Sequence, residues 1–456
     1  MGGEELRFRF LIQMFKMKTL NWFKCAGVLL AASGLVVGSV QAGTPPKGFV
    51  PLFNERDLTG WWGLKTEDPG KWMALPPAKL AEKKAASRKD IAQHWSVNGE
   101  ELVNDGHGLY LSTDKNYADF EMLVDYKTVA KADSGIYLRG IPQVQIWDST
   151  EEGGKWNIGA DKGSGGLWNN SKGAPGKDPI VLADKPFGQW NSFRIIMVGE
   201  RVSVWLNGNL LVDHARMENY FNRNGQVPRS GPIQLQTHGG EIRWRNVFIR
   251  EISANEANKI LASRGASGFE SAFNGNDLEG WGGPVKNYSV VNSEIHCLKG
   301  KGGTVFFNKE LSDFSARFEF KLPAGGNNGL AIRYPGSGDT AYSGMCELQV
   351  LDNTADKYAK LHPAQYHGSA YGMAAAARGY QRPVGEWNFQ QVTVVGTNIT
   401  VELNGTLILS TDLAKVDKPM YDLAKFKGRL RKSGFFGFAG HGDPVAFRNV
   451  SIREIK

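Results

Sequence analysis

One short stretch, present twice in the chain, holds the side chains best suited to binding a polar ligand and moving its protons. The first copy reads GIPQVQIWD and ends at Asp148, and the second reads GMCELQVLD and ends at Asp352. Residues two apart on a strand point to the same face of a sheet, so each copy places two long polar side chains on one surface. These pairs are Gln143 with Gln145, and Glu347 with Gln349.

Further polar groups lie at matching positions around this stretch. The preceding segments SGIYLRG and NGLAIRY contain Arg139 and Arg333, and the motifs THG and GHG add His238 and His441 near the end of each copy. Gln, Arg, Asp and His on one sheet face can hold a polyhydroxylated ligand, because sugar hydroxyls need both donors and acceptors. Aromatic side chains that could form the floor of such a site are Trp147, Trp168, Trp190 and Tyr371.

A structural interpretation of these residues stands beside the functional one. A polar face on an antiparallel sheet is common without any function. Several repeated residues are better explained as parts of the fold. We expect core or turn anchors at Trp61, Trp281, Trp190 and Trp387, and ion pairs at strand ends from Arg245 and Arg448.

The repeat extends over nearly the whole chain. FVPLFNERDLTGWWG from Phe49 returns as FESAFNGNDLEGWGG from Phe269, and RNVFIREI from Arg245 returns as RNVSIREI from Arg448. Two homologous domains therefore follow each other, and 456 residues are enough for each to bury its own core. We expect the first domain over residues 43–252, a short helical linker over 253–267 and the second domain over 268–456.

Both domains have the pattern of β-strands joined by tight turns. Apolar and polar residues alternate in segments such as FEMLVDY from Phe120, and Asn207-Gly208 and Asn404-Gly405 are typical of hairpins. No strand–helix–strand alternation occurs, so the predicted fold class is all-β, with each domain an antiparallel jelly-roll sandwich. The largest insertion in the first copy, Leu64 to His94, predicts a surface helix near residues 77–92.

The N-terminus has the pattern of an export signal. Lys18 and Lys24 precede an apolar run that ends in Val40-Gln41-Ala42, a sequence that suits a signal peptidase. We expect residues 1–42 to be a signal peptide cleaved after Ala42, with Met17 as an alternative start. The mature protein would then be secreted or periplasmic, with no membrane attachment once the signal is removed.

Cysteine content and charge bound the class further. After signal cleavage Cys297 and Cys346 remain, and in an oxidising compartment they could form one disulfide or stay as unpaired core thiols. Lys and Arg exceed Asp and Glu by 54 to 46, but they form no basic run. The composition therefore argues against nucleic acid as a partner.

The motifs together resemble the 3-keto-disaccharide hydrolase domain family. The first copy carries LFNERDLTGWWG, DSGIYLRGIPQVQIWD, GSGGLWNN, GQWNSFRI, VWLNG and GPIQLQTHGGEIRWRN, and the second carries AFNGNDLEGW, CELQVLDN, GEWN, VELNG and GHGDPVAFRN. The resemblance covers nearly all of the predicted mature chain. It implies a concanavalin A-like, glucanase-like jelly roll that acts on glycosides already oxidised at carbon 3. An upstream sugar 3-dehydrogenase would then supply the keto sugar.

The chemistry of such a substrate suggests roles for the repeated residues. A ketone at carbon 3 acidifies the proton on carbon 2, so a base can remove it and the substituent on carbon 1 can leave by β-elimination with the help of a proton donor. Water then adds, which gives net hydrolysis. We hypothesise that Glu347 or His441 acts as base or acid in the second domain and that Arg333 steadies the oxyanion. Gln349 and Asp352 would orient the sugar or a divalent ion.

The first domain repeats this set with one change. The acidic Glu347 is Gln143 there, so the two sites need not share a mechanism. A carboxylate with Gln and His could also bind a divalent metal such as Ca²⁺, although no loop in the sequence demands one. The alternatives are two carbohydrate-binding domains in tandem, one catalytic domain with one binding domain, or a structural module. The matching residues of the first domain are Arg139, Gln143, Gln145, Asp148 and His238.

Overall fold

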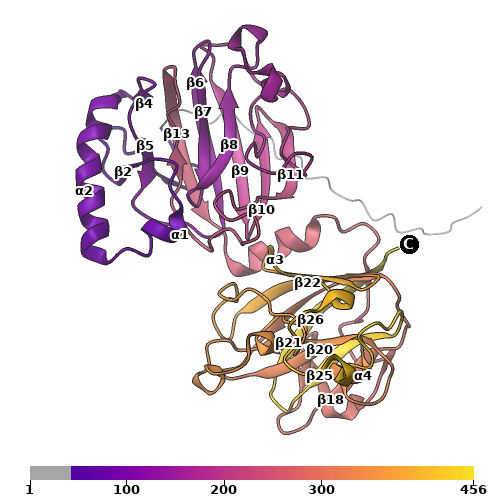
Figure 1. Cartoon of the computed structure of the whole chain (residues 1–456). Helices are drawn as coiled ribbons and strands as arrows, with labels where there is room; N and C mark the ends of the chain where they lie inside the picture. The colour runs from indigo at the N-terminus through magenta and orange to yellow at the C-terminus, as the bar shows by residue number, and fades with distance from the viewer. Residues whose placement is uncertain (1–42) are drawn as a thin grey trace, which may run out of the picture. The chain divides into compact units, whose positions relative to one another are not determined.

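The computed structural model describes residues 43–456, which form two β-sandwiches in succession along the chain (Figure 1). The predicted signal peptide, residues 1–42, lies outside the described residues. Each sandwich consists of one eight-stranded and one five-stranded sheet, and neighbouring strands pair in antiparallel fashion. The predicted fold class, two tandem concanavalin A-like jelly-roll sandwiches, is confirmed.

The first sandwich begins at β1 and ends at β13. Its larger sheet has, in spatial order, β11 (Asn209–Arg216), β10 (Arg201–Leu206), β9 (Asn191–Val198), β6 (Phe120–Thr128), β13 (Ile242–Glu251), β4 (Glu101–Asn104) and β3 (Trp95–Asn98), with β1 (Val50–Pro51) paired to β13. Its smaller sheet has β2 (Trp61–Leu64), β5 (Tyr110–Thr113), β12 (Gln234–Leu235), β7 (Asp133–Leu138) and β8 (Ile141–Trp147).

The second sandwich repeats this topology. Its larger sheet has β16 (Tyr288–Val291), β17 (Glu294–Cys297), β26 (Ala446–Glu454), β19 (Phe314–Lys321), β22 (Trp387–Val395), β23 (Asn398–Leu403) and β24 (Thr406–Asp412), with β14 (Glu270–Ser271) paired to β26. Its smaller sheet has β15 (Trp281–Gly282), β18 (Gly303–Phe307), β25 (Phe435–Gly440), β20 (Asn327–Tyr334) and β21 (Cys346–Leu351). The last two strands of each smaller sheet carry the repeated motif.

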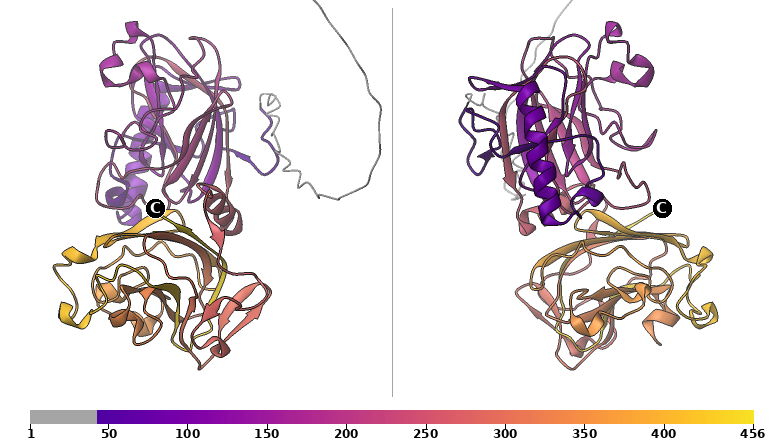
Figure 2. Two further views of the ribbon diagram at one scale, coloured as in Figure 1. Left: turned by 90° about the vertical axis from the view of Figure 1, so that its right-hand side faces the viewer. Right: turned by 60° about the vertical axis from the view of Figure 1, so that its left-hand side comes forward.

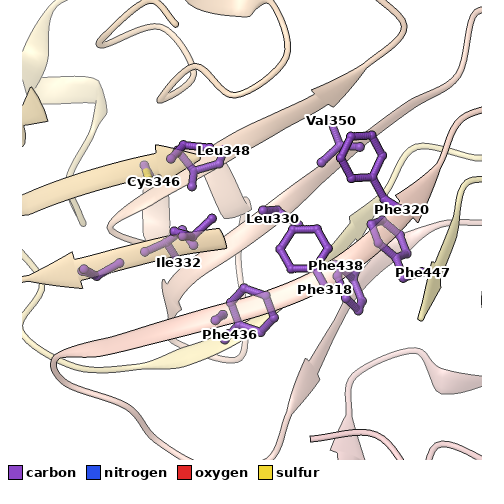
Figure 3. Close-up of a cluster of buried hydrophobic side chains, with 14 of the residues drawn as sticks. Phe318, Phe320, Leu330, Ile332, Cys346, Leu348, Val350, Phe436, Phe438 and Phe447 are labelled. Carbon is purple, nitrogen blue, oxygen red and sulfur yellow. The ribbon is translucent and has the colours of Figure 1, made fainter. Parts of the chain in front are cut away.

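The core of each sandwich lies between its two sheets. In the second sandwich, alternate residues of β20 and β21 point inward and meet phenylalanines of the larger sheet (Figure 3). Phe318 of β19 and Phe438 of β25 meet edge to face, with ring centroids 6.0 Å apart. Burying such large apolar side chains is the main source of stability for a sandwich of this size. Trp61 and Trp281 lie in the two cores, as expected.

Four α-helices accompany the strands in the described part of the chain. They are α1 (Pro69–Trp72), α2 (Pro77–His94), α3 (Ala254–Ser263) and α4 (Thr340–Ser343). The helix α2 is the predicted surface helix of the first copy, and α3 is the short helix expected in the linker (Figure 2). None of these helices is both long and apolar enough to cross a membrane.

Helix α2 covers one end of the smaller sheet in the first sandwich. The backbone N–H of Gly63 on β2 donates to the Ser87 hydroxyl of α2 over 2.9 Å. Trp62 and Trp72 pack edge to face nearby, with ring centroids 5.3 Å apart. The outward face of this sheet is therefore closed at β2, and its polar half lies at β7 and β8.

The structure also confirms the predicted hairpin and ion pairs, and it decides between the two alternatives for the cysteines. Asn207 and Gly208 both adopt left-handed backbone angles, φ 52° and 83°, as a tight hairpin requires. Arg245 pairs with Asp125 over 3.3 Å and Arg448 pairs with Glu319 over 2.8 Å. The two cysteines of the described chain, Cys297 and Cys346, are free and buried, so the alternative of unpaired core thiols is the one observed.

Candidate functional site

The outward face of each smaller sheet, opposite the core, carries the polar residues that the sequence singled out. On β8, Val144 and Ile146 enter the core, so Gln143 and Gln145 point to the other face. The same alternation holds on β21, where the outward pair is Glu347 and Gln349. A second polar element approaches this face, namely the histidine that follows β12 in the first sandwich and β25 in the second.

In the second sandwich the face holds a carboxylate and an imidazole in contact. Glu347 Oε1 lies 3.1 Å from His441 Nε2. The Glu347 side chain is 8% exposed and the His441 side chain is 45% exposed, so a buried acid meets a ring that reaches solvent. Within residues 43–456, His441 is the side chain that we find hydrogen-bonded to the Glu347 carboxylate. The second carboxylate oxygen is left to accept from a ligand.

A glycine makes room for this carboxylate. Gly329 lies on β20, and its backbone pairs with Gln349 of β21. A Cβ atom at position 329 would overlap the Glu347 side chain. Gly329 thus lets the acid lie flat across the sheet.

Gln349 is held in place by its neighbours on β20. Its amide nitrogen donates to the Asn327 side-chain oxygen over 2.6 Å and to the Asn328 carbonyl over 3.2 Å. Tyr371 borders the same strand, since its backbone N–H donates to the Glu347 carbonyl over 2.9 Å. Its ring is half-buried, and its hydroxyl accepts from Gln365 over 3.2 Å.

The first sandwich has a cluster at the same place, built around Asp133 at the start of β7. The amide nitrogen of Gln145 donates to Asp133 Oδ1 over 2.8 Å, and His238 Nδ1 lies 3.1 Å from Asp133 Oδ2. Lys155 forms an ion pair with the same Oδ2 atom. The side-chain amide nitrogen of Gln143 donates to the side-chain oxygen of Gln145. Both oxygens of this carboxylate are therefore bound.

The two clusters differ in where the carboxylate stands. Gly135 pairs with Gln145 as Gly329 pairs with Gln349, so Asp133, two residues earlier on β7, corresponds to Asn327 on β20. Each sandwich therefore has one acid and one amide at two positions, in opposite order. The pairs are Asp133 with Gln143 in the first sandwich, and Asn327 with Glu347 in the second.

Sequence reasoning missed three members of these clusters, namely Asp133, Asn327 and Lys155. The register that aligns Arg139 with Arg333 also aligns Asp133 with Asn327, so the strand residues were within reach of the alignment. Lys155 lies in a loop without a matching register. Only the fold brings it to Asp133.

The histidine–carboxylate contacts raise the pKa of both histidines and help to lower the pKa of Asp133. The hydrogen bond to Glu347 raises the pKa of His441, and the hydrogen bond to Asp133 raises the pKa of His238. Burial alone would raise the pKa of Asp133, but the hydrogen bonds from His238 and Lys155 outweigh burial and hold this pKa below its usual value. Asp133 is therefore an ionised carboxylate at neutral pH.

Asp148 and Asp352, predicted as site residues, lie at the ends of β8 and β21 and hold the loops that follow. Asp148 accepts from the backbone N–H groups of Lys131 and Thr150 over 2.7 Å and 2.8 Å. Asp352 accepts likewise from Gly325 and Thr354 over 2.8 Å and 2.9 Å. Burial raises the pKa of each carboxyl, but the hydrogen bonds lower it further, and neither carboxyl joins the cluster.

The structure also places Arg139 and Arg333 away from the clusters. Each side chain is 1% exposed. The Arg333 guanidinium donates to the Ser312, Gly396 and Arg431 carbonyls and pairs with Asp313 over 2.7 Å. Arg139 donates to the Ala118 and Pro228 carbonyls and pairs with Asp119 over 3.0 Å. Both guanidinium groups are thus buried and bound to backbone carbonyls and an aspartate, so they hold the fold and do not reach the sheet face that carries the clusters.

The predicted aromatic floor is divided among several places. Trp147 is buried beside the cluster of the first sandwich and meets Trp168 edge to face, with ring centroids 5.9 Å apart. Trp190 directly precedes β9 of the larger sheet, where Arg245 and Lys127 lie over its ring at 4.2 Å and 4.5 Å. It is therefore a structural anchor rather than part of the floor. Tyr371 lies beside Glu347, as described above.

A metal site does not fit the groups present. No three His, Cys, Asp or Glu side chains come together in residues 43–456 in a way that would hold a metal ion. Each cluster offers one carboxylate and one imidazole, and the imidazole nitrogen that faces the carboxylate is used in the contact.

Comparison with known proteins gives this arrangement a family. A model of the 3-keto-alpha-glucoside-1,2-lyase-like domain matches residues 48–250 and again residues 268–453. The two matches together cover more than half of the chain. The protein therefore belongs to this family and carries its domain twice, as the motifs predicted.

The chain is also similar to individual proteins. A protein of Bacteroides thetaiotaomicron named 3-keto-disaccharide hydrolase is 27% identical over 267 residues, which make up 50% of this chain and 91% of that protein. A crystal structure of a candidate glycosyl hydrolase from Parabacteroides distasonis is 25% identical, covers 41% of this chain and 99% of its own, and has a TM-score of 0.38. A second such structure from that organism is 24% identical, covers 42% and 95%, and has a TM-score of 0.36. The family and the named relative support a glycoside hydrolase-like activity.

Proposed function

We propose that this protein cleaves glycosides whose sugar is oxidised at carbon 3, and that the second sandwich carries the reaction. The observation that carries the proposal is the contact of Glu347 with His441 on the outward sheet face. A buried carboxylate with one free oxygen and a solvent-reaching imidazole are suited to take up and deliver protons at neighbouring atoms of a bound sugar.

The proposed reaction is an elimination followed by hydration. Glu347 takes the proton from carbon 2, whose acidity comes from the neighbouring ketone, and the electron pair of that bond forms a double bond between carbons 1 and 2. The bond from carbon 1 to the leaving oxygen breaks, and protonated His441 gives that oxygen its proton. Water then adds its oxygen to carbon 1 and a proton returns to carbon 2, so the sum is hydrolysis.

Two further side chains support the proposal. Gln349 is anchored to Asn327 and lies on the same face as Glu347, so it is placed to orient the sugar. Tyr371 is placed at the edge of the same strand and can contact the sugar ring. Arg333 and Asp352 hydrogen-bond to backbone groups, so their role is to hold the fold. The enolate would then be stabilised by hydrogen-bond donors other than Arg333, which the bound sugar contacts on the outward sheet face.

Two further parts of the proposal concern the setting of the reaction. The N-terminal pattern of Lys18, Lys24 and Val40-Gln41-Ala42 favours export of the mature chain. A 3-keto glycoside is also an oxidation product, so an enzyme of the sugar 3-dehydrogenase class must act before this protein. Both points are inferred from sequence and from substrate chemistry.

The test is turnover of a 3-keto-glucoside by the full chain after substitution of the pair. Glu347→Gln and His441→Ala should each lower kcat by about a hundredfold or more, the usual scale of general acid and base catalysis. A matched control exists in the same sandwich, because His296 and Glu294 form a histidine–carboxylate contact of 3.1 Å on the larger sheet. His296→Ala should leave kcat within about twofold of the wild-type value.

The outcomes separate the candidate functions. Unchanged turnover in both Glu347→Gln and His441→Ala would exclude the pair as the acid and base. Binding of the 3-keto-glucoside by the wild-type chain without any product would favour a carbohydrate-binding protein instead.

A further inference from the structure

We propose that the first sandwich carries a separate, non-catalytic binding site for an unoxidised, uncharged sugar, formed by the Asp133 cluster and the exposed ring of Trp156. This inference goes beyond the proposed function and does not depend on it. It is carried by the state of the carboxylate, by free acceptor atoms in the cluster and by the position of the tryptophan.

The first step is that Asp133 has no free oxygen for proton transfer. Oδ1 accepts from Gln145 over 2.8 Å, and Oδ2 is shared by His238 and Lys155. A general base must reach the proton that it abstracts through an available lone pair, and it loses basicity beside two cationic groups. The cluster can bind polar groups, but it lacks the free acid oxygen that Glu347 has in the second sandwich.

The second step concerns the hydrogen-bonding atoms left over. Gln236 follows β12 beside Gly135 and is 6% exposed, and its side-chain oxygen has no hydrogen-bond partner among the described residues. The hydroxyl oxygen of neighbouring Thr237 is likewise buried and without a partner in that part of the chain. A buried polar atom without a partner costs roughly 1–3 kcal/mol, so the Gln236 oxygen, which lies beside Gly135, favours a ligand that supplies the missing bond.

The third step is the kind of group that those atoms require. The Gln236 oxygen is an acceptor, and a sugar hydroxyl can donate to it whereas a ketone cannot. An intact hydroxyl at carbon 3 therefore suits this cluster better than an oxidised one. The positive charge of Lys155 is paired with the carboxylate of Asp133, so this lysine is not free to bind an acidic sugar.

The fourth step is an exposed aromatic residue in the segment that carries Lys155. Trp156 follows Lys155 directly in the chain and is 46% exposed. Its indole N–H donates to the Ser149 carbonyl over 3.0 Å, which fixes the ring at the end of β8. Exposed aromatic rings stack on the apolar face of a sugar, and hydrogen-bonding groups beside the ring fix its orientation.

The second sandwich lacks this feature. The segment that follows β21 has Tyr358 and Tyr366 in place of an exposed tryptophan, and Tyr366 is buried. The pairing of a blocked carboxylate with an exposed ring is thus particular to the first sandwich. It fits a domain that holds a glycan and does not cleave it.

The experiment measures binding of trehalose, sucrose and maltose to the full chain in the Glu347→Gln background by titration calorimetry. Trp156→Ala should weaken binding of the sugar that binds best by about tenfold or more, and Trp156→Phe should restore most of that loss. Ile158→Ala is the matched control, because Ile158 is also 46% exposed and lies two residues further along. It should leave the affinity within about twofold.

Binding and turnover are then compared in the otherwise wild-type chain. Trp156→Ala should leave kcat on a 3-keto-glucoside within about twofold, and a hundredfold loss would instead make the first sandwich a catalytic centre. No binding of any of the three sugars would overturn the proposal. An equal loss of affinity in Ile158→Ala would also overturn it, because a general apolar contact would then explain the effect.

Discussion

The two sandwiches share a frame and differ in one exchange between neighbouring strands. Both have a glycine beneath the cluster, and a glutamine whose side chain hydrogen-bonds to β7 or β20. In both, a histidine also contacts the carboxylate. The first sandwich carries its acid on β7 as Asp133, whereas the second carries it on β21 as Glu347. Each site has one acidic side chain, so the two sites differ in what surrounds the acid and not in the number of acids.

The surroundings favour opposite uses of the carboxylate. Asp133 is held by Gln145, His238 and Lys155, whereas Glu347 is held by His441. The residue next to the glycine differs as well, because Gln236 lies beside Gly135 where Ala439 lies beside Gly329. The comparison teaches that access to an acid, as much as its presence, separates a site that can catalyse from a site that can only bind.

The glycines offer the most severe way to break the comparison. Gly329→Ala should lower kcat on a 3-keto-glucoside by about ten- to a hundredfold, because the new Cβ would overlap the Glu347 carboxylate and push it off the sheet. Gly135→Ala should change kcat by less than about threefold, since its Cβ would lie 3.0 Å from Gln143 and Gln236 in the site that does not turn over. Thermal unfolding of both variants checks that each still folds. Equal losses of kcat would mean that the two sites work together.

Rebuilding the first site on the pattern of the second would sharpen the comparison. Asp133→Asn, Gln143→Glu and Lys155→Ala together move the acid to β8 and remove the lysine that blocks it. In the Glu347→Gln background this triple substitution should raise turnover by about tenfold over that background. Asp133→Asn alone should raise nothing. A correctly folded triple variant without any gain would show that the position of the acid is not what separates the two sites.

The smallest expected effect is a pH dependence of stability. The pKa of His441 and of His238 is raised in the folded state, so each pair contributes most below the unfolded pKa of about 6.5 and loses this contribution as the pH rises through the folded-state value. Both rings are substantially exposed, so solvent screening keeps each effect below ~1 kcal/mol. Urea unfolding from about pH 6 to pH 9 should show this decline in the wild type. His441→Gln and His238→Gln should each flatten it, and an unchanged slope in either variant would contradict the assignment.

The fold was largely readable from the sequence. Period-two alternation predicts the strands, and the Asn-Gly pairs fix the hairpins because both residues must adopt left-handed angles. The repeat itself predicts two sandwiches. The surface helix α2 also follows from the sequence. It lies in an insertion that the second copy lacks, and the insertion is rich in Ala, Lys and Glu, which favour helix.

The candidate site was only partly readable. The pairs on β8 and β21 follow from strand periodicity, and the histidines follow from the repeat. Arg139 and Asp148 recur in both copies as well, but they recur because the fold needs them: a buried guanidinium collects backbone carbonyls, and the aspartate collects backbone N–H groups. Repetition alone cannot tell such residues from catalytic ones. Lys155 shows the converse, since a contact made by a loop leaves no pattern in the chain.

The buried thiols give the second sandwich a property that the first does not have. Cys346 immediately precedes Glu347 on β21 and points into the core as a free thiol, while the chain from residue 43 to the end of β13 contains no cysteine. A thiol reagent can modify Cys346 only when the strand separates from its neighbours, so the rate of modification reports local opening of the strand that carries the proposed base. The natural sequence thus contains its own probe for opening in one sandwich, with the other silent to the same reagent.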